Sequence, residues 1–333
     1  MKPVFKYIFL SVLVIAVAGF FIFAISEKKT EEQKYRELFS RDYRILVPPL
    51  PSAMDFAGEK VPLDRYYVRE SLDREITAVT FMHSSTIMMF KRANRWFPVI
   101  EPILKKNHIP DDFKYLVVAE SNLSNAVSGA GAEGFWQFVK PTGIKYGLEI
   151  TEEVDERYNV EKATQAACDF FRDSYEIFKS WTMVAASFNR GTEGVSKAIQ
   201  NQNETCYYDL YFVEETSRYV YRILAMKELY LHPGKYGFFL RQADFYPQIP
   251  VTTVTVDTPV TDLAVFAAKM KITYRMLREL NPWIRRYNLP NKSGKTYQIL
   301  LPNGGMPGIS NLYRNIPESK IFFHDSLSPD RIH

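Results

Sequence analysis

Apolar residues recur at three- and four-residue spacing through most of the chain between Val68 and Ala243, which is the period of an amphipathic α-helix. The segments that show this period most clearly are 96–106, 112–121, 163–178 and 217–230. Continuous alternation of apolar and polar residues, the pattern of a half-buried strand, is absent from this stretch. The pattern therefore predicts a single, mainly α-helical domain.

Two local signals place boundaries inside this domain. Asn159 is predicted to cap the helix that follows it, because its side-chain oxygen can accept a hydrogen bond from the first helical turn. Pro141 followed by Gly143 predicts a break in the chain before the next element.

The pattern changes after Tyr246 and Pro247. Residues 251–256 alternate as in a strand, and residues 296–302 have the composition of a second strand that closes the unit. Between them, 261–270 and 273–280 have the pattern of two short helices. We therefore expect a small β-α-α-β module over residues 246–302, followed by a polar tail over 303–333.

Residues 1–26 have the pattern of a membrane segment. The run from Ile8 to Ile25 carries no charge, and Lys2 and Lys6 precede it. The positive end favours the cytoplasmic side, so this segment predicts a single-pass inner-membrane anchor with the rest of the chain in the periplasm. The alternative is a cleaved signal segment and secretion to the periplasm. Residues 27–66, which include the proline-rich stretch 47–51, are predicted to form a linker between the anchor and a helical domain over 67–245.

Charge and cysteine usage narrow the function. The 42 basic and 38 acidic residues give a net charge of only +4 without any basic block, so nucleic-acid binding is not expected. Cys168 and Cys206 permit one disulfide, although the position of Cys168 within a predicted helix favours a buried free thiol. The zinc patterns HExxH and CxxC are absent, and we expect neither a metal nor another cofactor.

A candidate acid closes the apolar segment 112–121. Glu120 and Ser121 are its last residues, and apolar neighbours disfavour the ionised form of a carboxylic acid. A pKa raised in this way lets the group hold the proton that a general acid must donate. The alternative for Glu120 alone is an ordinary exposed glutamate at a helix end.

The second candidate segment is glycine-rich and aromatic, from Ser128 to Phe138. Gln137 offers a donor and an acceptor beside the rings of Phe135 and Trp136, a combination that suits an N-acetylated sugar. The alternative is a tight loop whose rings only fill the core. Glu133, in the same segment, is expected to face solvent.

Two further segments carry polar groups on predicted helices. Phe188 and Asn189 precede Gly191, and the Asn189 amide could face a groove or hydrogen-bond to nearby backbone. Tyr219 lies among apolar residues of the segment 217–230, where a tyrosine usually belongs to the core.

The order of these segments resembles the lysozyme-like lytic transglycosylase family, and within it the membrane-bound murein transglycosylases of the D type. Glu-Ser comes first, then a glycine-rich loop ending in Gly-Phe-Trp-Gln, then Ser-Phe-Asn-Arg-Gly, and then Glu-Thr-Ser-Arg-Tyr-Val. The resemblance covers residues 67–243 and implies a mainly α, lysozyme-like catalytic domain. One departure is Phe188, where the family often has tyrosine. The loss of that hydroxyl is expected to alter one hydrogen bond without changing the reaction.

The resemblance implies cleavage of the β-1,4 bond between N-acetylmuramic acid and N-acetylglucosamine in peptidoglycan glycan strands. Glu120 would act first as acid and then as base, and the product would carry a 1,6-anhydro ring. Ser121 would position Glu120, Gln137 or Asn189 would orient the sugar together with Phe188, and Tyr219 would lie near the cleaved bond. Two alternatives stay open: a hydrolase similar to goose-type lysozyme, and a non-catalytic cell-wall glycan-binding protein.

The C-terminal unit resembles the LysM glycan-binding module in residues 256–264 and 277–284 and in the strand 297–302. The match departs from the usual pattern at Val256, where the module commonly has glycine. A structural role and glycan binding are both open for this module, and no protein partner is indicated.

Overall fold

The computed structural model describes residues 45–292 and 294–304, together with the isolated positions 32, 33, 36, 37, 308 and 312. The predicted anchor Ile8–Ile25 and nearly all of the predicted tail lie outside the described residues. Within the part that is described, no helix has both the length and the apolar character needed to cross a membrane.

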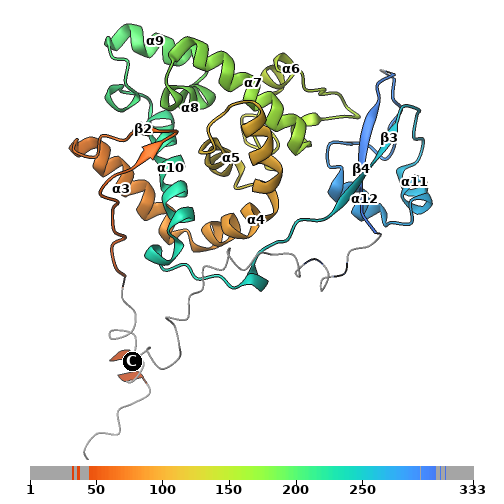
Figure 1. Ribbon diagram of the computed structural model, residues 1–333, viewed down its shortest axis with the longest axis horizontal. Coiled ribbons are helices and arrows are strands. Elements are labelled where there is room, and N and C mark those ends of the chain that lie inside the picture. Colours follow the sequence, from red (N-terminus) through yellow and green to blue (C-terminus); the bar gives the residue numbers. More distant parts are fainter. Residues whose placement is uncertain are drawn as a thin grey trace, which may run out of the picture. The chain divides into compact units, whose positions relative to one another are not determined.

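The expected fold class is confirmed, because the described chain consists mostly of helices and ends in a small two-stranded unit (Figure 1). A short hairpin, β1 and β2, precedes the helices. The elements of the helical domain are β1 (Asp55–Phe56), β2 (Glu59–Lys60), α3 (Tyr66–Phe81), α4 (His83–Lys106), α5 (Phe113–Ser121), α6 (Lys140–Lys145), α7 (Val160–Phe178), α8 (Trp181–Arg190), α9 (Thr192–Gln202) and α10 (Glu214–Leu231). Short 3-10 helices occur at Glu156–Tyr158, Tyr207–Asp209, Pro233–Tyr236 and Gln242–Asp244.

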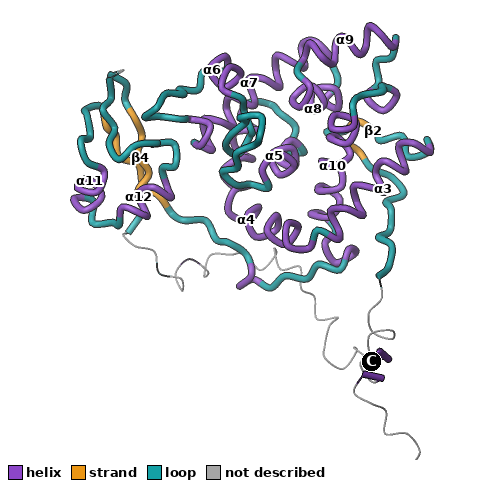
Figure 2. The backbone as a smooth tube through the Cα atoms, turned by 180° about the vertical axis from the view of Figure 1, so that it is seen from behind, coloured by secondary structure: helices purple, strands orange, loops and turns teal. Residues whose placement is uncertain are grey.

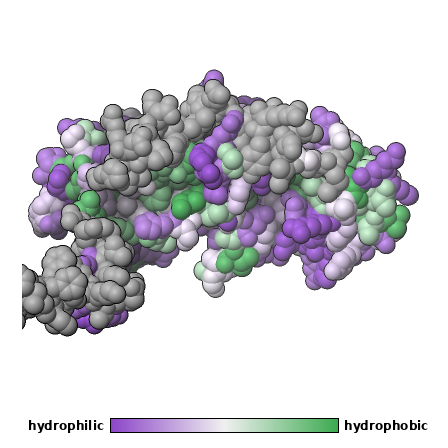
Figure 3. Space-filling model, turned by 90° about the horizontal axis from the view of Figure 1, so that it is seen from below, coloured by the Kyte–Doolittle hydropathy of each residue, from purple (hydrophilic) through white to green (hydrophobic). Residues whose placement is uncertain are grey.

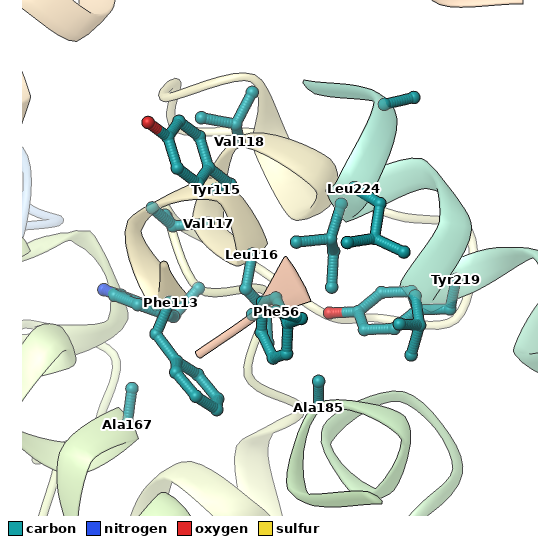
Figure 4. Packing of buried hydrophobic residues seen from close by; sticks show 14 of the residues in the cluster. Phe56, Phe113, Tyr115, Leu116, Val117, Val118, Ala167, Ala185, Tyr219 and Leu224 are labelled. Atoms are coloured by element: carbon teal, nitrogen blue, oxygen red, sulfur yellow. The ribbon is translucent and has the colours of Figure 1, made fainter. Parts of the chain in front are cut away.

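Helix α5 occupies the middle of the helical domain, with α4, α7, α8 and α10 around it (Figures 1 and 2). Every residue from Phe113 to Val118 is buried. A helix that is apolar on all sides must be surrounded by other elements. Figure 4 shows this packing, with Tyr219 and Leu224 of α10 on one side of α5 and Ala167 of α7 on the other. The apolar composition of α5 thus explains its central position, which leaves the acid in its last turn half-buried.

One of the two local signals is confirmed and the other is wrong. The Asn159 side chain caps α7 by accepting a hydrogen bond from the Lys162 backbone N–H at 3.1 Å. Pro141 and Gly143 do not break the chain, because both lie inside α6. Proline is compatible with a first helical turn, where its missing N–H would have no partner. Gly143 allows close packing, since a Cβ there would lie 2.8 Å from Ile150 Cδ1.

Residues 48–66, assigned to the linker from the sequence, belong to the same compact unit as the helices. Phe56 and Val61 are buried in the core of the helical domain. The Glu59 carboxylate accepts hydrogen bonds from the Thr182 backbone N–H and the Ser180 hydroxyl, both at 2.9 Å, at the start of α8. The packed domain therefore begins earlier than the hydrophobic pattern indicates, because a short hairpin has no helical period.

The C-terminal module has the expected order: β3 (Val251–Val256), α11 (Leu263–Lys269), α12 (Tyr274–Leu280) and β4 (Tyr297–Pro302). The strands pair antiparallel from Val251 opposite Pro302 to Val256 opposite Tyr297. The module's apolar core also includes Val154 and Tyr158 of the helical domain. The Asp155 N–H donates to Trp283 O at 2.8 Å, and the Arg285 N–H donates to Glu153 O at 2.7 Å. The module is therefore packed against residues 153–158.

The two cysteines do not form the disulfide that the sequence permits. Cys168 and Cys206 are both free thiols, and burial raises the pKa of Cys168 to about 12, which keeps it protonated and unreactive.

On the face drawn in Figure 3, hydrophobic residues lie in separate small patches among hydrophilic ones. Scattered apolar surface of this kind is normal for a folded protein and needs no ligand.

Candidate active site

Glu120 lies in the last turn of α5 and lines a pocket of about 390 Å³. Helices α3 and α10, which pack side by side, form the opposite wall. The lining is largely apolar and includes Val118, Met82, Met89 and Met226. The pocket thus combines one accessible carboxyl group with apolar surface, as binding sites for uncharged rings commonly do.

Tyr219 makes the direct contact with Glu120. Its ring is buried on α10 and points toward α5 in Figure 4, and its hydroxyl donates a hydrogen bond to Glu120 Oε1. Burial raises the pKa of Tyr219 well above 10, so the hydroxyl keeps its proton and remains a donor. Its expected place near the cleaved bond of the substrate stays a prediction.

The carboxyl group of Glu120 has an unusual proton affinity. Burial raises its pKa to about 7, whereas the hydrogen bond from Tyr219 and the positive charge of Arg222 act in the opposite direction. Burial is the larger effect because the ionised form loses its hydration. Glu120 therefore exists in both protonation states near neutral pH, as a group that must first give and then take a proton requires.

The turn after Glu120 is held by backbone contacts. The Ser121 hydroxyl donates to Val117 O at 3.3 Å and accepts from the Ser124 N–H at 3.4 Å. Asn122 ends α5 with a left-handed φ of 50° and donates from its amide to Ser85 O at 3.0 Å. Ser121 lines the pocket, and its hydrogen bonds fix the backbone that carries Glu120.

Gln137 uses its side-chain amide within the glycine-rich loop. Its Nε2 donates to Ala126 O at 2.9 Å and to Gly134 O at 2.7 Å, so both amide hydrogens serve the loop backbone. Trp136 is fully buried and donates from its indole nitrogen to the Thr164 hydroxyl at 2.9 Å. These contacts fix the shape of the loop, and direct contact of Gln137 with a sugar stays a prediction.

Glu133 does not face solvent as the sequence indicated. Its carboxylate is 3.1 Å from Arg157 Nη2 and accepts a hydrogen bond from the Tyr158 hydroxyl at 2.7 Å. The prediction failed because Arg157 and Tyr158 come from a 3-10 helix, whose position beside the loop has no periodic signal. Since Tyr158 also belongs to the core of the C-terminal module, Glu133 links the loop to that module.

Phe188 and Asn189 lie at the end of α8. The Phe188 ring packs against Trp136, Phe138, Phe170 and Phe171 in an aromatic cluster. Asn189 Oδ1 accepts a hydrogen bond from the Thr216 hydroxyl at 2.9 Å, which joins α8 to α10. Neither residue lines the pocket of Glu120, and their contact with substrate stays a prediction.

Three charged residues of the pocket were not singled out from the sequence: Glu75, Arg218 and Arg222. The Glu75 side chain is only 2% exposed and accepts a hydrogen bond from Arg218 Nε at 2.7 Å. The two arginines are four residues apart on α10 and so share one helix face. The sequence shows the spacing of the two arginines, but it does not show their contact with Glu75, which is 143 residues away from Arg218 in the chain.

No group of three or more His, Cys, Asp and Glu side chains within the described ranges is arranged to hold a metal ion. His83, the first residue of α4, contacts the rings of Phe81 and Phe238.

Comparison with known proteins defines the class of this fold and site. Residues 97–210 match the transglycosylase SLT domain, and residues 252–305 match the C-terminal LysM-like domain of soluble lytic transglycosylases. Part of the helical domain is therefore similar to a lytic transglycosylase domain, and the module that follows it is similar to a LysM-like domain.

Two curated proteins are similar to this chain in sequence. The chain is 28% identical over 241 residues to the membrane-bound lytic murein transglycosylase D of Escherichia coli strain K12, and equally to that of strain O6:H1. The similarity covers 71% of this chain and 51% of each relative. The chain thus spans about half the length of these curated relatives.

Replacement of Tyr219 by phenylalanine tests whether the Tyr219 hydroxyl lowers the pKa of Glu120. The variant keeps the buried ring but loses the hydrogen bond that favours ionised Glu120, so the pKa of Glu120 is expected to rise. Because the acid works in its protonated form, kcat/KM should fall only at higher pH than in the wild type, and its maximum should drop about tenfold. A pH profile of kcat/KM measures both effects. An alkaline limb that stays in place or moves to lower pH would show that the hydroxyl does not act on Glu120.

Glu120→Gln should stabilise the fold above neutral pH. Ionised Glu120 is disfavoured in the pocket, and since its pKa rises on folding, the wild type loses stability as the pH increases from about 4.5 to about 7. Glutamine does not titrate, so the variant should be more stable by roughly 1–3 kcal/mol at pH 8 and by little at pH 4. Urea unfolding at the two pH values measures the difference. Equal gains at both values would mean that packing, not ionisation, is responsible.

Proposed function

We propose that this protein is a peptidoglycan lytic transglycosylase that cleaves the bond between N-acetylmuramic acid and N-acetylglucosamine and leaves 1,6-anhydro ends. The observation that supports it most is Glu120, a carboxyl group with a pKa of about 7 in the last turn of the central helix. The match to the transglycosylase SLT domain supplies the reaction class. Most glycosidases employ two carboxyl groups, so a single working acid favours a mechanism in which the substrate supplies the second group.

The reaction has two proton transfers through one residue. Protonated Glu120 donates its proton to the glycosidic oxygen, and the bond from that oxygen to the muramyl C1 breaks, which releases N-acetylglucosamine with a free hydroxyl. Ionised Glu120 then accepts the proton of the muramyl C6 hydroxyl. At the same time the C6 oxygen forms a bond to C1 and closes the 1,6-anhydro ring. The residue returns to its initial state, and water is not consumed.

Tyr219 stabilises the intermediate state of this cycle. Its hydroxyl donates to the carboxylate, so it favours Glu120 after the first proton has left. Ser121 positions Glu120 through the turn that follows it, and Gln137 holds the loop that faces the sugar. Asn189 and Phe188 act by orienting the substrate or the walls that contact it.

Glu75 is unsuited to the role of a second catalytic carboxylate. It lines the pocket, but it is 2.7 Å from Arg218, 3.3 Å from Arg74 and 3.8 Å from Arg222. A carboxylate whose oxygens are engaged by several guanidinium groups has little room left to contact a sugar or a water molecule. This pairing favours the transglycosylase over a hydrolase similar to goose-type lysozyme.

The proposed layout places this chemistry outside the cytoplasm. Residues 1–26 anchor the chain in the inner membrane or direct its secretion, residues 48–245 form the catalytic domain, and residues 246–302 form the LysM-like module. The glycan strands of the periplasm are the substrate, and the module either binds them or supports the catalytic domain.

Digestion of purified sacculi by the full-length chain tests the proposal. Mass spectrometry of the released fragments should find muramyl ends that lack one water relative to reducing ends. Reducing ends would indicate the hydrolase. Binding to sacculi without any release would favour the non-catalytic glycan-binding protein.

A further inference from the structure

The pocket of Glu120 contains two arginines that the proposed reaction does not use. Arg218 and Arg222 lie one turn apart on α10, and both line the pocket together with Glu120. Their side chains are 29% and 32% exposed, and both residues contribute to the lining of the pocket. The pocket therefore presents fixed positive charge to whatever occupies it.

Of these two arginines, Arg222 has the weaker contacts with the acidic side chains around it. Arg218 donates to Glu75 at 2.7 Å and is 3.4 Å from Glu214. Arg222 is 3.8 Å from Glu75, which allows an ion pair but is too long for a hydrogen bond. Within the described ranges Arg222 donates no hydrogen bond, although a guanidinium group carries five N–H donors.

The net charge of the pocket also favours a negatively charged ligand. When Glu120 holds its proton, the ionised groups that line the pocket are Arg218, Arg222 and Glu75, which leave one net positive charge. A planar guanidinium group matches the two oxygens of a carboxylate and binds them through parallel hydrogen bonds. A negatively charged group is thus the chemistry that would complete this site.

Peptidoglycan carries such a group beside the bond that is cleaved. N-acetylmuramic acid bears a lactyl ether whose carboxyl group is free in strands without peptides. In intact strands that carboxyl is joined to a peptide stem, which carries carboxylates of its own. The same site can therefore meet a carboxylate from either source next to the muramyl ring.

We propose that Arg222, assisted by Arg218, binds a substrate carboxylate attached to the muramyl residue whose glycosidic oxygen Glu120 protonates. This inference rests on the proposed function and adds a specificity-determining site to it. The carboxylate places the muramyl residue on the α10 wall and so aligns its glycosidic oxygen with the acid at the end of α5.

The position of Arg222 also links binding to the state of the acid. Burial and the negative charge of Glu215 raise the pKa of Glu120, whereas Tyr219 and Arg222 lower it. A carboxylate bound to Arg222 offsets that positive charge. Substrate binding thereby favours the protonated Glu120 that the first step needs.

The test compares three soluble glycan substrates: strands with peptide stems, strands with free lactyl carboxylates, and peptide-free strands whose lactyl carboxylates are methylated. Arg222→Gln removes the charge, and Arg222→Lys keeps it without the planar fork. Arg241→Gln is the matched control, because the Arg241 side chain is 73% exposed, pairs with Asp244 and does not line the pocket. Melting curves of all variants show whether each one folds.

We expect Arg222→Gln to lose roughly 10- to 100-fold in kcat/KM on a carboxylate-bearing substrate, mostly through KM, and to match the wild type on the methylated strands. Arg222→Lys should recover part of the loss, and Arg241→Gln should show none. A loss confined to one charged substrate identifies the source of the carboxylate. An equal loss on the methylated strands, or none beyond the control, overturns the inference while the proposed function stands. A wild type that cleaves none of the three overturns both.

Discussion

Glu120→Gln is expected to reduce the release of muropeptides from sacculi by a factor of about 1000 or more. General acid–base catalysis contributes roughly 100- to 10,000-fold, and here a single residue performs both proton transfers. Glutamine preserves the size of the side chain and can still accept the hydrogen bond from Tyr219, so the pocket should keep its shape. The rate of release, measured with saturating sacculi, gives the effect.

Two comparisons make this result specific. Glu193→Gln, at an exposed position on α9, should leave the rate unchanged. The Glu120 variant should still bind sacculi, because binding does not need the proton. If it released fragments as fast as the wild type, the acid would have to be another group.

Gly134→Ala is expected to destabilise the protein by roughly 3–5 kcal/mol and to remove most of its activity. Gly134 has a φ of +81°, and a Cβ there would lie 2.0 Å from the backbone oxygen of Arg157. Backbone atoms cannot move aside as a flexible side chain can, so the loop and the segment around Arg157 must separate. Chemical unfolding and sacculus digestion measure the two effects.

Gly131→Ala separates the effect of the steric contact with Arg157 from the effect of backbone strain at a positive φ. Gly131 has a similar φ of +79°, but a Cβ there would have no atom within 4 Å. Alanine at this position should therefore cost only about 1–2 kcal/mol, the price of a left-handed conformation. Equal losses for the two variants would mean that strain alone governs the loop.

The helical period predicted the fold well because most of the core is built from helices with several turns. The four segments with the clearest period lie within α4, α5, α7 and α10, apart from Asp112 just before α5. The same apolar run predicted a raised pKa for Glu120, and this is confirmed at about 7. Burial on all sides of one helix is a local property of its sequence, so it could be read in advance.

Contacts between distant segments could not be read in this way. The pairing of Glu75 with Arg218 and the packing of residues 55–61 depend on how the elements assemble. Gln137 and Phe188 illustrate the same limit, since their residue types suit a sugar but their contacts hold a loop and an aromatic cluster. Residue type predicts what a side chain can do, whereas tertiary contacts decide which of its groups remain available.

The central claim is that Glu120 moves both protons and that water takes no part. Digestion of sacculi in water labelled with heavy oxygen tests it most directly. The account predicts that the new muramyl ends carry no label, because the C6 oxygen of the same sugar closes the ring. Heavy oxygen at muramyl C1 in the first products would contradict it and identify a hydrolase.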